Sequence, residues 1–332
     1  MSRTAVMCGI GGWVPPTLVT NADLAARLDT SDEWITTRTG IRQRYVVPPG
    51  MSTSDLAVEA GRAALKSADL DSADAVIVAT TTPDRTCPAT APTVASRLGL
   101  AGVAAFDVAA VCTGFLYALA TGAGLVSTGQ ADRVLVIGAD AFSTILDPGD
   151  RSTVSVFGDG AGAVVLRPGE ATEPGALAGF CLGSDGSLAD LITVRAGGSE
   201  QRSAGAASPG DEFFSMQGRE VFEHAVSKMA VAARTAAERA GWRLDEVDRF
   251  VAHQANVRIL RAVADQLDLD HSRLVVDLDR VGNTAAASIP LALDHANADG
   301  TLRPGDRVVA AAFGGGATWG ATTFVWPRLR SI

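Results

Sequence analysis

Apolar runs alternate with helix-like segments along the chain, and this order occurs twice. The stretch "DSADAVIVATTT" at 71–82 has a polar lead-in and a continuous apolar run typical of a buried strand, and "DEVDRFVAHQAN" at 245–256 repeats it. "DRVLVIGAD" at 132–140 is repeated in the same way by "DRVVAAAFGGG" at 306–316. The aspartates just before the strands show the same offset in both pairs, from Asp74 to Asp248 and from Asp132 to Asp306. The pattern therefore predicts an internal duplication.

An Ala-rich helix is predicted between the two strands of each half, at 113–128 and at 284–297. Both helices have small apolar residues on nearly every face, which is typical of helices buried between sheets. Apolar strands that alternate with helices predict an α/β fold with largely parallel sheets covered on both faces. We expect two halves, 1–172 and 173–332, with the low-complexity segment 196–212 as a surface excursion.

Composition narrows the class of protein. The chain has 332 residues, of which 47% are hydrophobic and 20% are charged, as in soluble globular proteins. It has no apolar run long enough to span a membrane and no signal-peptide pattern at its start, so we expect a cytoplasmic protein without membrane contact. The four cysteines are far apart and form no C-x-x-C pair, which argues against disulfides and a metal site. The net charge of −9 argues against nucleic-acid binding.

One cysteine stands at a position suited to chemistry. "FDVAAVCTGFLYALA" at 106–120 places Cys112 between a strand and a helix. The N–H groups and the macrodipole at a helix start favour a thiolate. The structural alternative is a buried cysteine that packs as a small hydrophobe.

The second half supplies polar groups at equivalent places. "VAHQAN" puts His253 at the end of a strand, "RVGNTAAASIP" puts Asn283 just before the buried helix, and "FGGGATWG" forms a loop whose N–H groups can approach a substrate. Each feature has a structural alternative, namely a core histidine, a helix cap and a tight bend. Together with Cys112 they indicate one site.

Two glycine-rich segments do not indicate nucleotide binding. The "GGG" loop lacks the Gly-Lys-Ser/Thr of a P-loop. "FGDGAGAVVL" at 157–166 resembles a dinucleotide fingerprint, but a β-like run follows it where that motif requires a helix. We therefore interpret it as a turn between strands.

Across its whole length the chain resembles β-ketoacyl-acyl carrier protein synthase III, a family of condensing enzymes that start fatty-acid or polyketide chains. The resemblance rests on "TNADLAARLDTSDEWITTRTGIRQR", "AAFDVAAVCTGFLYAL", "DRSTVSVFGDGAGAVVL", "VAHQANVRI", "GNTAAASIPLAL" and "FGGGATWG". It implies an α/β thiolase fold of two pseudo-duplicated halves in alternating helix and sheet layers, and a homodimer. It also implies that Cys112 is the acylated nucleophile, that His253 and Asn283 are the decarboxylation pair, and that the N–H groups of Cys112 and Gly315 form the oxyanion hole. No cofactor is implied.

The resemblance further implies binding sites for coenzyme A and a carrier protein. Trp34 matches the residue that stacks on adenine, Arg38 and Arg151 match nucleotide and phosphate contacts, and Gly218 and Asn256 match the pantetheine tunnel or its mouth. Ordinary packing of a half-exposed aromatic is the alternative for Trp34. Where several relatives carry lysines around this mouth, the chain departs from the pattern with Glu223, Asp265 and Gln266. The arginines that remain as contacts for an acidic carrier protein are Arg219, Arg258 and Arg261.

The acyl pocket is implied in the same way. Cys87 falls where the family places the residue that crosses the dimer interface and closes the neighbour's pocket, and Phe115 and Leu116 are candidate wall residues. Acetyl-preferring members can carry a bulky aromatic at the Cys87 position. We therefore expect branched or medium-length acyl groups to be accepted better than acetyl.

These residues imply condensation of an acyl-coenzyme A with malonyl-acyl carrier protein. A thiolase would need a second cysteine on the "FGGGATWG" loop, and a hydroxymethylglutaryl-coenzyme A synthase would need an acidic general acid. An acyltransferase or hydrolase of the same fold could also use Cys112 and His253, although Asn283 favours condensation because simple acyl transfer forms no enolate. A non-catalytic coenzyme A binding protein would not need Cys112, His253 and Asn283.

Overall fold

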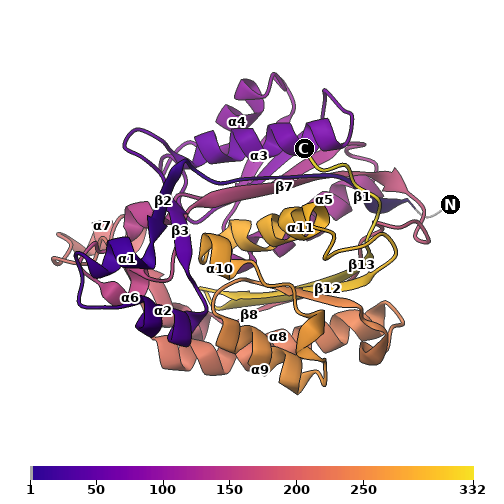
Figure 1. The fold of residues 1–332 in the computed structure, drawn as a ribbon. Coiled ribbons are helices and arrows are strands. Elements are labelled where there is room, and N and C mark those ends of the chain that lie inside the picture. The colour runs from indigo at the N-terminus through magenta and orange to yellow at the C-terminus, as the bar shows by residue number, and fades with distance from the viewer. Residues whose placement is uncertain (1–2) are drawn as a thin grey trace.

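Two β-sheets stacked with two helices between them form the centre of the molecule (Figure 1). The computed structural model describes residues 3–332. The five-stranded sheet has the order β1 (Thr4–Trp13), β7 (Gly160–Gly169), β6 (Val134–Asp140), β4 (Ala75–Ala79) and β5 (Ala104–Val108). The four-stranded sheet has the order β11 (Arg249–Ala252), β12 (Arg307–Gly314), β13 (Thr318–Val325) and β8 (Ala178–Ser184).

Both sheets are mixed, so the expectation of largely parallel sheets is wrong. Strand β4 is parallel to β5 and β6, and β11 is parallel to β12. The pairs β1–β7, β6–β7, β12–β13 and β13–β8 are antiparallel. Continuous apolar runs indicate strands covered on both faces, and such strands can run in either direction.

Helices cover the sheets in layers. Helices α5 (Gly114–Ser127) and α11 (Ser288–Ala298) lie between the two sheets, as expected from their apolar faces. The outer face of the five-stranded sheet is covered by α3 (Thr53–Ser67) and α4 (Ala91–Arg97), and that of the four-stranded sheet by α8 (Gly218–Arg239) and α9 (Val257–Gln266) (Figure 1). In the part of the chain that the structure describes, no helix combines the length and apolarity needed to cross a membrane.

Smaller elements surround these layers. Two further sheets pair β2 (Thr17–Thr20) with β3 (Gln43–Val46) and β9 (Ile192–Val194) with β10 (Phe214–Met216). The short α-helices are α1 (Asn21–Ala25), α2 (Asp32–Thr39), α6 (Arg151–Val154), α7 (Ser199–Ala204) and α10 (Leu278–Val281). The 3-10 turns are η1 (Val111–Thr113), η2 (Phe142–Ile145), η3 (Gly186–Leu191), η4 (Leu244–Glu246), η5 (His271–Arg273) and η6 (Ala285–Ala287). The segment 196–212 is largely exposed and carries α7 at the edge of the molecule, which confirms the predicted surface excursion.

The element boundaries confirm the duplication. Strands β1 and β8 begin at Thr4 and Ala178, β4 and β11 at Ala75 and Arg249, and α5 and α11 at Gly114 and Ser288, so all three pairs share the offset seen in the sequence. Turns η1 and η6 precede the two central helices, and each begins with a residue of positive φ, Val111 at 47° and Ala285 at 48°. A left-handed backbone at these residues is strained and is commonest at functional sites.

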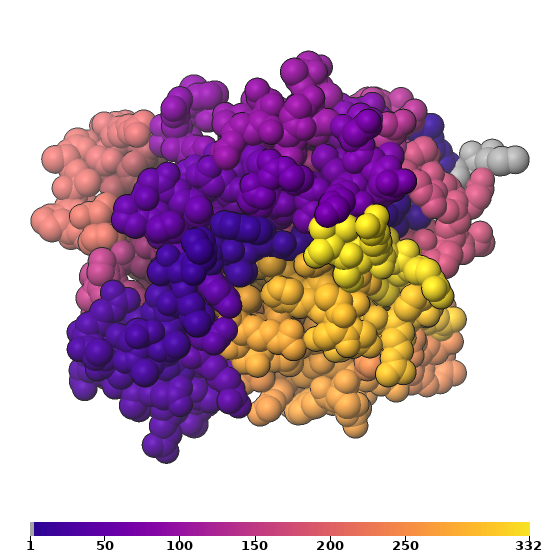
Figure 2. Space-filling view, turned by 45° about the horizontal axis from the view of Figure 1, so that its top comes forward, coloured from indigo at the N-terminus to yellow at the C-terminus, as the bar shows by residue number. Residues whose placement is uncertain are grey.

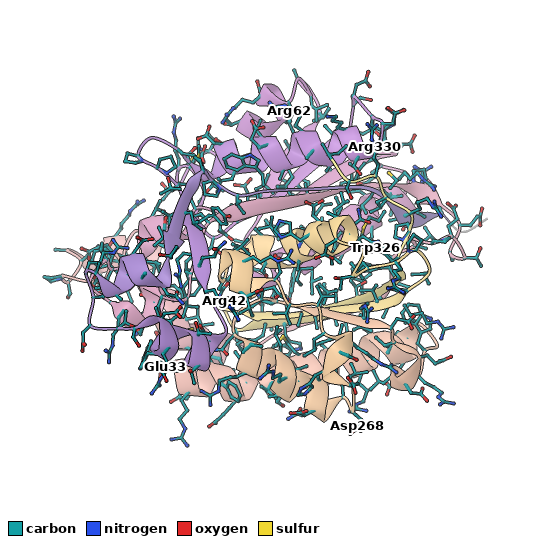
Figure 3. The ribbon with its side chains drawn as sticks, viewed as in Figure 1. Glu33, Arg42, Arg62, Asp268, Trp326 and Arg330 are labelled. Atoms are coloured by element: carbon teal, nitrogen blue, oxygen red, sulfur yellow. The ribbon has the colours of Figure 1, made fainter. Side chains whose placement is uncertain are left out.

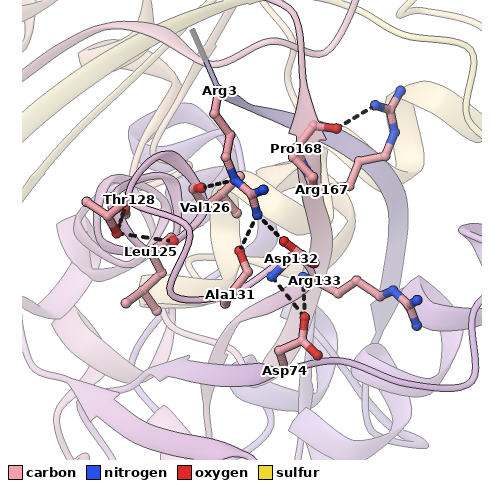
Figure 4. A network of polar contacts seen from close by, with 11 residues as sticks. Arg3, Asp74, Leu125, Val126, Thr128, Ala131, Asp132, Arg133, Arg167 and Pro168 are labelled. Atoms are coloured by element: carbon pink, nitrogen blue, oxygen red, sulfur yellow. Dashed lines mark hydrogen bonds and ion pairs between the residues drawn. The ribbon is translucent and has the colours of Figure 1, made fainter. Parts of the chain in front are cut away.

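Polar contacts fasten both ends of the chain to the layers. The Arg3 side chain donates to the carbonyl of Val126 at 2.6 Å and pairs with Asp132, which joins the start of β1 to the end of α5 (Figure 4). At the other end, Ser67 Oγ donates to the Arg330 carbonyl at 2.6 Å, and the C-terminal segment lies along the boundary between the halves (Figure 2). Trp326 is fully buried beside α11 (Figure 3).

Candidate active site

Cys112 lies in η1, between strand β5 and helix α5, and is 7% exposed. Burial, together with the nearby Asp140 carboxylate, raises the pKa of its thiol above the ordinary value. Burial therefore outweighs the preference for a thiolate that was expected from the helix start. The resting site therefore holds a thiol.

His253 follows strand β11 and is 4% exposed. Its ring Nδ1 lies 2.6 Å from the hydroxyl of Ser288, the first residue of α11, and its backbone N–H donates to the Ala311 carbonyl at 2.8 Å. Burial lowers the pKa of His253 to about 3. The imidazole is therefore neutral at physiological pH.

Asn283 precedes η6 and is 4% exposed. Its Oδ1 accepts the N–H of Ala285 at 2.9 Å, so the capping interpretation describes one end of this side chain. Its backbone is fixed to the segment before β7, where its N–H donates to Val156 and its carbonyl accepts the N–H of Gly158. Because Oδ1 is engaged, the amide NH2 is the group left to donate to a ligand.

Cys112, His253 and Asn283 line one cavity of about 40 Å³. Its other walls are almost entirely apolar, with the side chains of Phe142, Phe157, Ile192, Phe214, Met216, Val221, Ala225, Met229, Ala255, Ile259 and Phe313. Of these, Phe142 and Phe157 stack at 4.3 Å between ring centroids, and Phe214 meets both edge-on at 5.0 Å. This aromatic wall was not found by sequence reasoning, because its rings come from separate segments that carry no common local pattern.

Gln254, next to His253, is a second residue that sequence reasoning missed. Its Nε2 donates to the carbonyls of Ala252 and Val275, and its Oε1 accepts the N–H groups of Asp277 and Leu278. The side chain is fully buried and all its hydrogen-bonding capacity is used. It therefore fixes the loop that carries His253, and a polar residue beside His253 in "VAHQAN" was the available signal.

The glycine loop between β12 and β13 approaches Cys112 closely. A Cβ at Gly314 would lie 2.8 Å from the Cys112 nitrogen, and one at Gly315 would lie 3.1 Å from Ile192. A second, more open hollow of about 490 Å³ lies beside this loop and shares Ile192 with the cavity. Its lining residues are Thr80, Thr81, Pro83, Asp107, Ala109, Ala110, Val111, Ala189, Ile192, Gly315, Gly316 and Thr318.

Three residues expected at the acyl pocket lie elsewhere in the described protomer. Phe115 and Leu116 are fully buried in the core between the sheets and line neither hollow. Cys87 is exposed on the loop before α4. The assignment of Phe115 and Leu116 to the pocket wall is therefore corrected.

Four of the five residues expected to bind coenzyme A lie together at α2. The Trp34 ring lies between two guanidinium groups, with Arg38 at 4.9 Å and Arg151 at 5.1 Å from its centroid. Asn256 caps α9 through Oδ1 and donates from Nδ2 to the Arg38 carbonyl at 3.1 Å, which ties α9 to α2. Gly218 is exposed at the start of α8.

The expected carrier contacts are exposed. Arg258 and Arg261 lie on α9, and Arg219 lies in the first turn of α8, where it pairs with Glu223 at 3.4 Å. The Asp265 carboxylate on α9 lies 2.7 Å from Nε2 of His271. This face therefore carries both acidic and basic side chains.

Comparison with known proteins places the chain. The family model "3-Oxoacyl-[acyl-carrier-protein (ACP)] synthase III" matches residues 106–186, and its C-terminal counterpart matches 237–326. Two relatives from Streptomyces coelicolor, named beta-ketoacyl-[acyl-carrier-protein] synthase III 5 and III 3, are 57% and 60% identical, and in both cases the match covers 100% of each chain.

Solved structures agree with these matches. The 3-oxoacyl-(acyl carrier protein) synthase III of Pseudomonas aeruginosa PAO1 is similar with a TM-score of 0.93 and 50% identity, over 99% of this chain and 100% of that one. The priming beta-ketosynthase of the R1128 polyketide pathway is similar with a TM-score of 0.90 and 32% identity, over 98% and 97%. The fold is that of the thiolase-fold condensing enzymes, a class of acyltransferases. The chain belongs to the β-ketoacyl-acyl carrier protein synthase III family, which confirms the resemblance seen in its motifs.

Proposed function

We propose that the enzyme condenses an acyl-coenzyme A starter with malonyl-acyl carrier protein, releasing coenzyme A and carbon dioxide and forming 3-ketoacyl-acyl carrier protein. The observation that carries the proposal is the single cavity lined by Cys112, His253 and Asn283. Full-length identity of 57% and 60% to beta-ketoacyl-[acyl-carrier-protein] synthases III supports it. The product would initiate fatty-acid or polyketide synthesis.

The first half-reaction transfers the acyl group to Cys112. The thiol loses its proton as sulfur attacks the thioester carbon, and the bond to the coenzyme A sulfur breaks, so that coenzyme A leaves as a thiol with that proton. The proton passes to the coenzyme A sulfur as the carbon–sulfur bond breaks, so acylation does not depend on His253, whose pKa of about 3 makes it a weak base. The N–H groups of Cys112 and Gly315 stabilise the tetrahedral oxyanion.

The second half-reaction needs a neutral imidazole. Malonyl-acyl carrier protein loses carbon dioxide, and the electron pair of the broken bond forms an enolate whose carbon attacks the acyl carbon on Cys112. The bond from that carbon to the Cys112 sulfur then breaks, and the sulfur leaves as a thiolate that takes a proton from water to restore the thiol. Hydrogen bonds from His253 Nε2 and the Asn283 amide stabilise the enolate oxygen without protonating it, because a neutral imidazole is a poor acid. When the Ser288 hydroxyl donates to His253 Nδ1, the ring proton lies on Nε2, the atom that donates to the enolate oxygen.

The substrates reach the cavity from the surface near α2. We propose that adenine enters between Trp34 and one of the two guanidinium groups that now cover its ring, with the other arginine available for phosphate. Gly218 and Asn256 would border the pantetheine arm. Arg219, Arg258 and Arg261 would meet the acidic carrier protein.

We propose a homodimer in which the Cys87 loop of a second copy closes the acyl pocket. Strand β5 is an edge strand with no neighbour on its outer side in the described sheet, and the 490 Å³ hollow lies beside it. An unpaired edge is a natural place for a second chain to pair. Cys87 is exposed, as such a role requires.

The chemistry uses two thioesters and no electron transfer, so no cofactor is proposed. We propose that the enzyme acts in the cytoplasm, because Cys112 has to stay reduced to act as a nucleophile and all four cysteines are free.

The test is product formation from purified components. Acyl-coenzyme A, malonyl-acyl carrier protein and enzyme should together yield 3-ketoacyl-acyl carrier protein and carbon dioxide. Acyl transfer to the carrier without carbon dioxide release would instead show a simple acyltransferase.

A further inference from the structure

The two halves differ in whether the backbone N–H just before their central helix has a hydrogen-bond acceptor. Cys112 and Ala286 occupy equivalent positions in the two halves, each directly after a residue of positive φ. In the C-terminal half, the Ala286 N–H donates to Oδ2 of Asp140 at 2.9 Å. In the N-terminal half, no other residue among 3–332 accepts the Cys112 N–H, which lies toward the residue's own sulfur.

The residue equivalent to Asp140 explains the difference. Asp140 ends β6 and Gly314 ends β12, the strand that corresponds to β6 in the second half. A Cβ at Gly314 would lie 2.8 Å from the Cys112 nitrogen and 3.0 Å from the Thr113 nitrogen. Any side chain at this position would press on the N–H group of Cys112, so glycine is required to leave it open.

Asp140, in contrast to Gly314, provides an acceptor for the equivalent N–H group. The carboxylate is fully buried, and its Oδ1 accepts the N–H groups of Thr81 and Thr82 at 2.6 and 3.2 Å. Through Oδ2 it holds Ala286, whose neighbour Ala285 donates to Asn283. Asp140 therefore joins the loop after β4 to the turn that orients the Asn283 side chain.

We propose that Asp140 and Gly314, which occupy equivalent positions in the two halves, determine which half-reaction each half serves. Asp140 is a positioning residue that caps the Ala286 N–H and thereby orients Asn283 for decarboxylation. Gly314 leaves the equivalent Cys112 N–H uncapped, so that the thioester oxygen accepts it during acylation. The Asp140 oxygen that accepts the Ala286 N–H therefore corresponds, in the other half, to the oxyanion that accepts the Cys112 N–H during the reaction. This inference rests on the proposed function.

The first test is Gly314→Ala. The rate at which Cys112 becomes acylated by isobutyryl-coenzyme A, followed by intact mass, should fall at least about 100-fold, the usual cost of losing one oxyanion donor. Decarboxylation of malonyl-acyl carrier protein without acyl-coenzyme A should change less than about threefold. Gly124→Ala, at an exposed site with open space on α5, is the matched control and should change neither rate. Alkylation of Cys112 by iodoacetamide, which needs no oxyanion hole, should keep its wild-type rate.

The second test is Asp140→Asn. An asparagine that keeps its oxygen toward Thr81 and Thr82 turns its NH2 toward the Ala286 N–H, so the cap is lost while the side-chain volume is kept. Decarboxylation should fall at least about tenfold and acylation less than about threefold, the reverse of the Gly314→Ala pattern.

Three outcomes separate the claims. Wild-type enzyme that forms no acyl-Cys112 would defeat the proposed function itself. Wild-type activity together with Gly314→Ala acylation above one tenth of normal, or with equal loss of both half-reactions in Asp140→Asn, would overturn the pairing. If Gly314→Ala lacks a cooperative thermal transition, the Asp140→Asn result decides alone.

Discussion

Burial shifts the pKa values of Cys112 and His253 in opposite directions. The pKa of Cys112 is raised and that of His253 is lowered to about 3, so both groups are neutral before substrate binds. Charge then appears only during the reaction, within reach of N–H and amide donors. The sequence places these residues at strand ends, but their protonation depends on cavity walls supplied by distant segments such as those of Phe142 and Phe214.

Acylation should single out Cys112 among the four cysteines. Cys112 alone of them lines the cavity that also holds His253 and Asn283. Intact mass after treatment with isobutyryl-coenzyme A should rise by one acyl group, and Cys112→Ser should abolish the rise. Cys181→Ser is the control and should acylate normally. An acyl group found at Cys8 or Cys181 by peptide mapping would refute the assignment.

The low pKa of His253 predicts how stability depends on pH. Between pH 6.5 and about 3 the unfolded chain binds a proton at this residue and the folded chain does not, so its contribution to stability falls as pH drops below 6.5. From pH 7.5 to pH 5.0, wild type should lose about 2 kcal/mol more of its unfolding free energy than His253→Gln, as measured by urea titration. Equal losses in the two proteins would show that the buried imidazole titrates normally.

At the scale of elements, the repeated pattern located the central strands and helices. The predicted helices 113–128 and 284–297 contain α5 and most of α11, and each of these helices follows a short 3-10 turn that periodicity does not distinguish. Strand direction was not predictable, because an apolar run is the same in either direction. The pocket roles given to Phe115 and Leu116 were wrong for a related reason, since a helix that is apolar on all faces gives no sign of which face meets the site.

The aromatic wall should matter for stability as well as for the site. Phe142 is fully buried, stacks on Phe157 and meets Phe214 edge-on. Phe142→Ala should lower the unfolding free energy by about 3–5 kcal/mol in urea titration. Phe222→Ala, at a half-buried site on α8, is the control and should lose clearly less. A loss for Phe142→Ala no larger than that control would show that the wall collapses without cost.

At the scale of the whole molecule, the duplicated halves bring the proposed nucleophile and the proposed decarboxylation pair into a single cavity. The Cys112 strand and helix come from the N-terminal half, and His253 and Asn283 come from the C-terminal half. The five-stranded sheet ends at β5, which leaves an open edge beside the hollow next to the glycine loop. The identity of the starter is therefore expected to depend on what a second copy places there.

Cys87 should set the length of the starter. A cysteine leaves space that a phenylalanine would fill, and each further buried methylene contributes about 0.8 kcal/mol. Isobutyryl- and hexanoyl-coenzyme A should therefore give higher kcat/KM than acetyl-coenzyme A in wild type, and Cys87→Phe should reverse the ranking. Thr86→Phe, at the exposed neighbouring position, is the control. If acetyl leads in wild type and Cys87→Phe leaves the ranking unchanged, Cys87 does not limit the pocket.

The most direct test of the account measures both half-reactions in His253→Ala and Asn283→Ala, with His271→Ala, an exposed histidine, as the control. Acylation of Cys112 is followed by intact mass, and release of carbon dioxide from malonyl-acyl carrier protein is followed separately. Because the enolate forms only in the second half-reaction, both variants should lose decarboxylation at least about 100-fold and keep most of their acylation, while the control keeps both. Normal decarboxylation in the two variants, or equal loss of both half-reactions, would contradict the account.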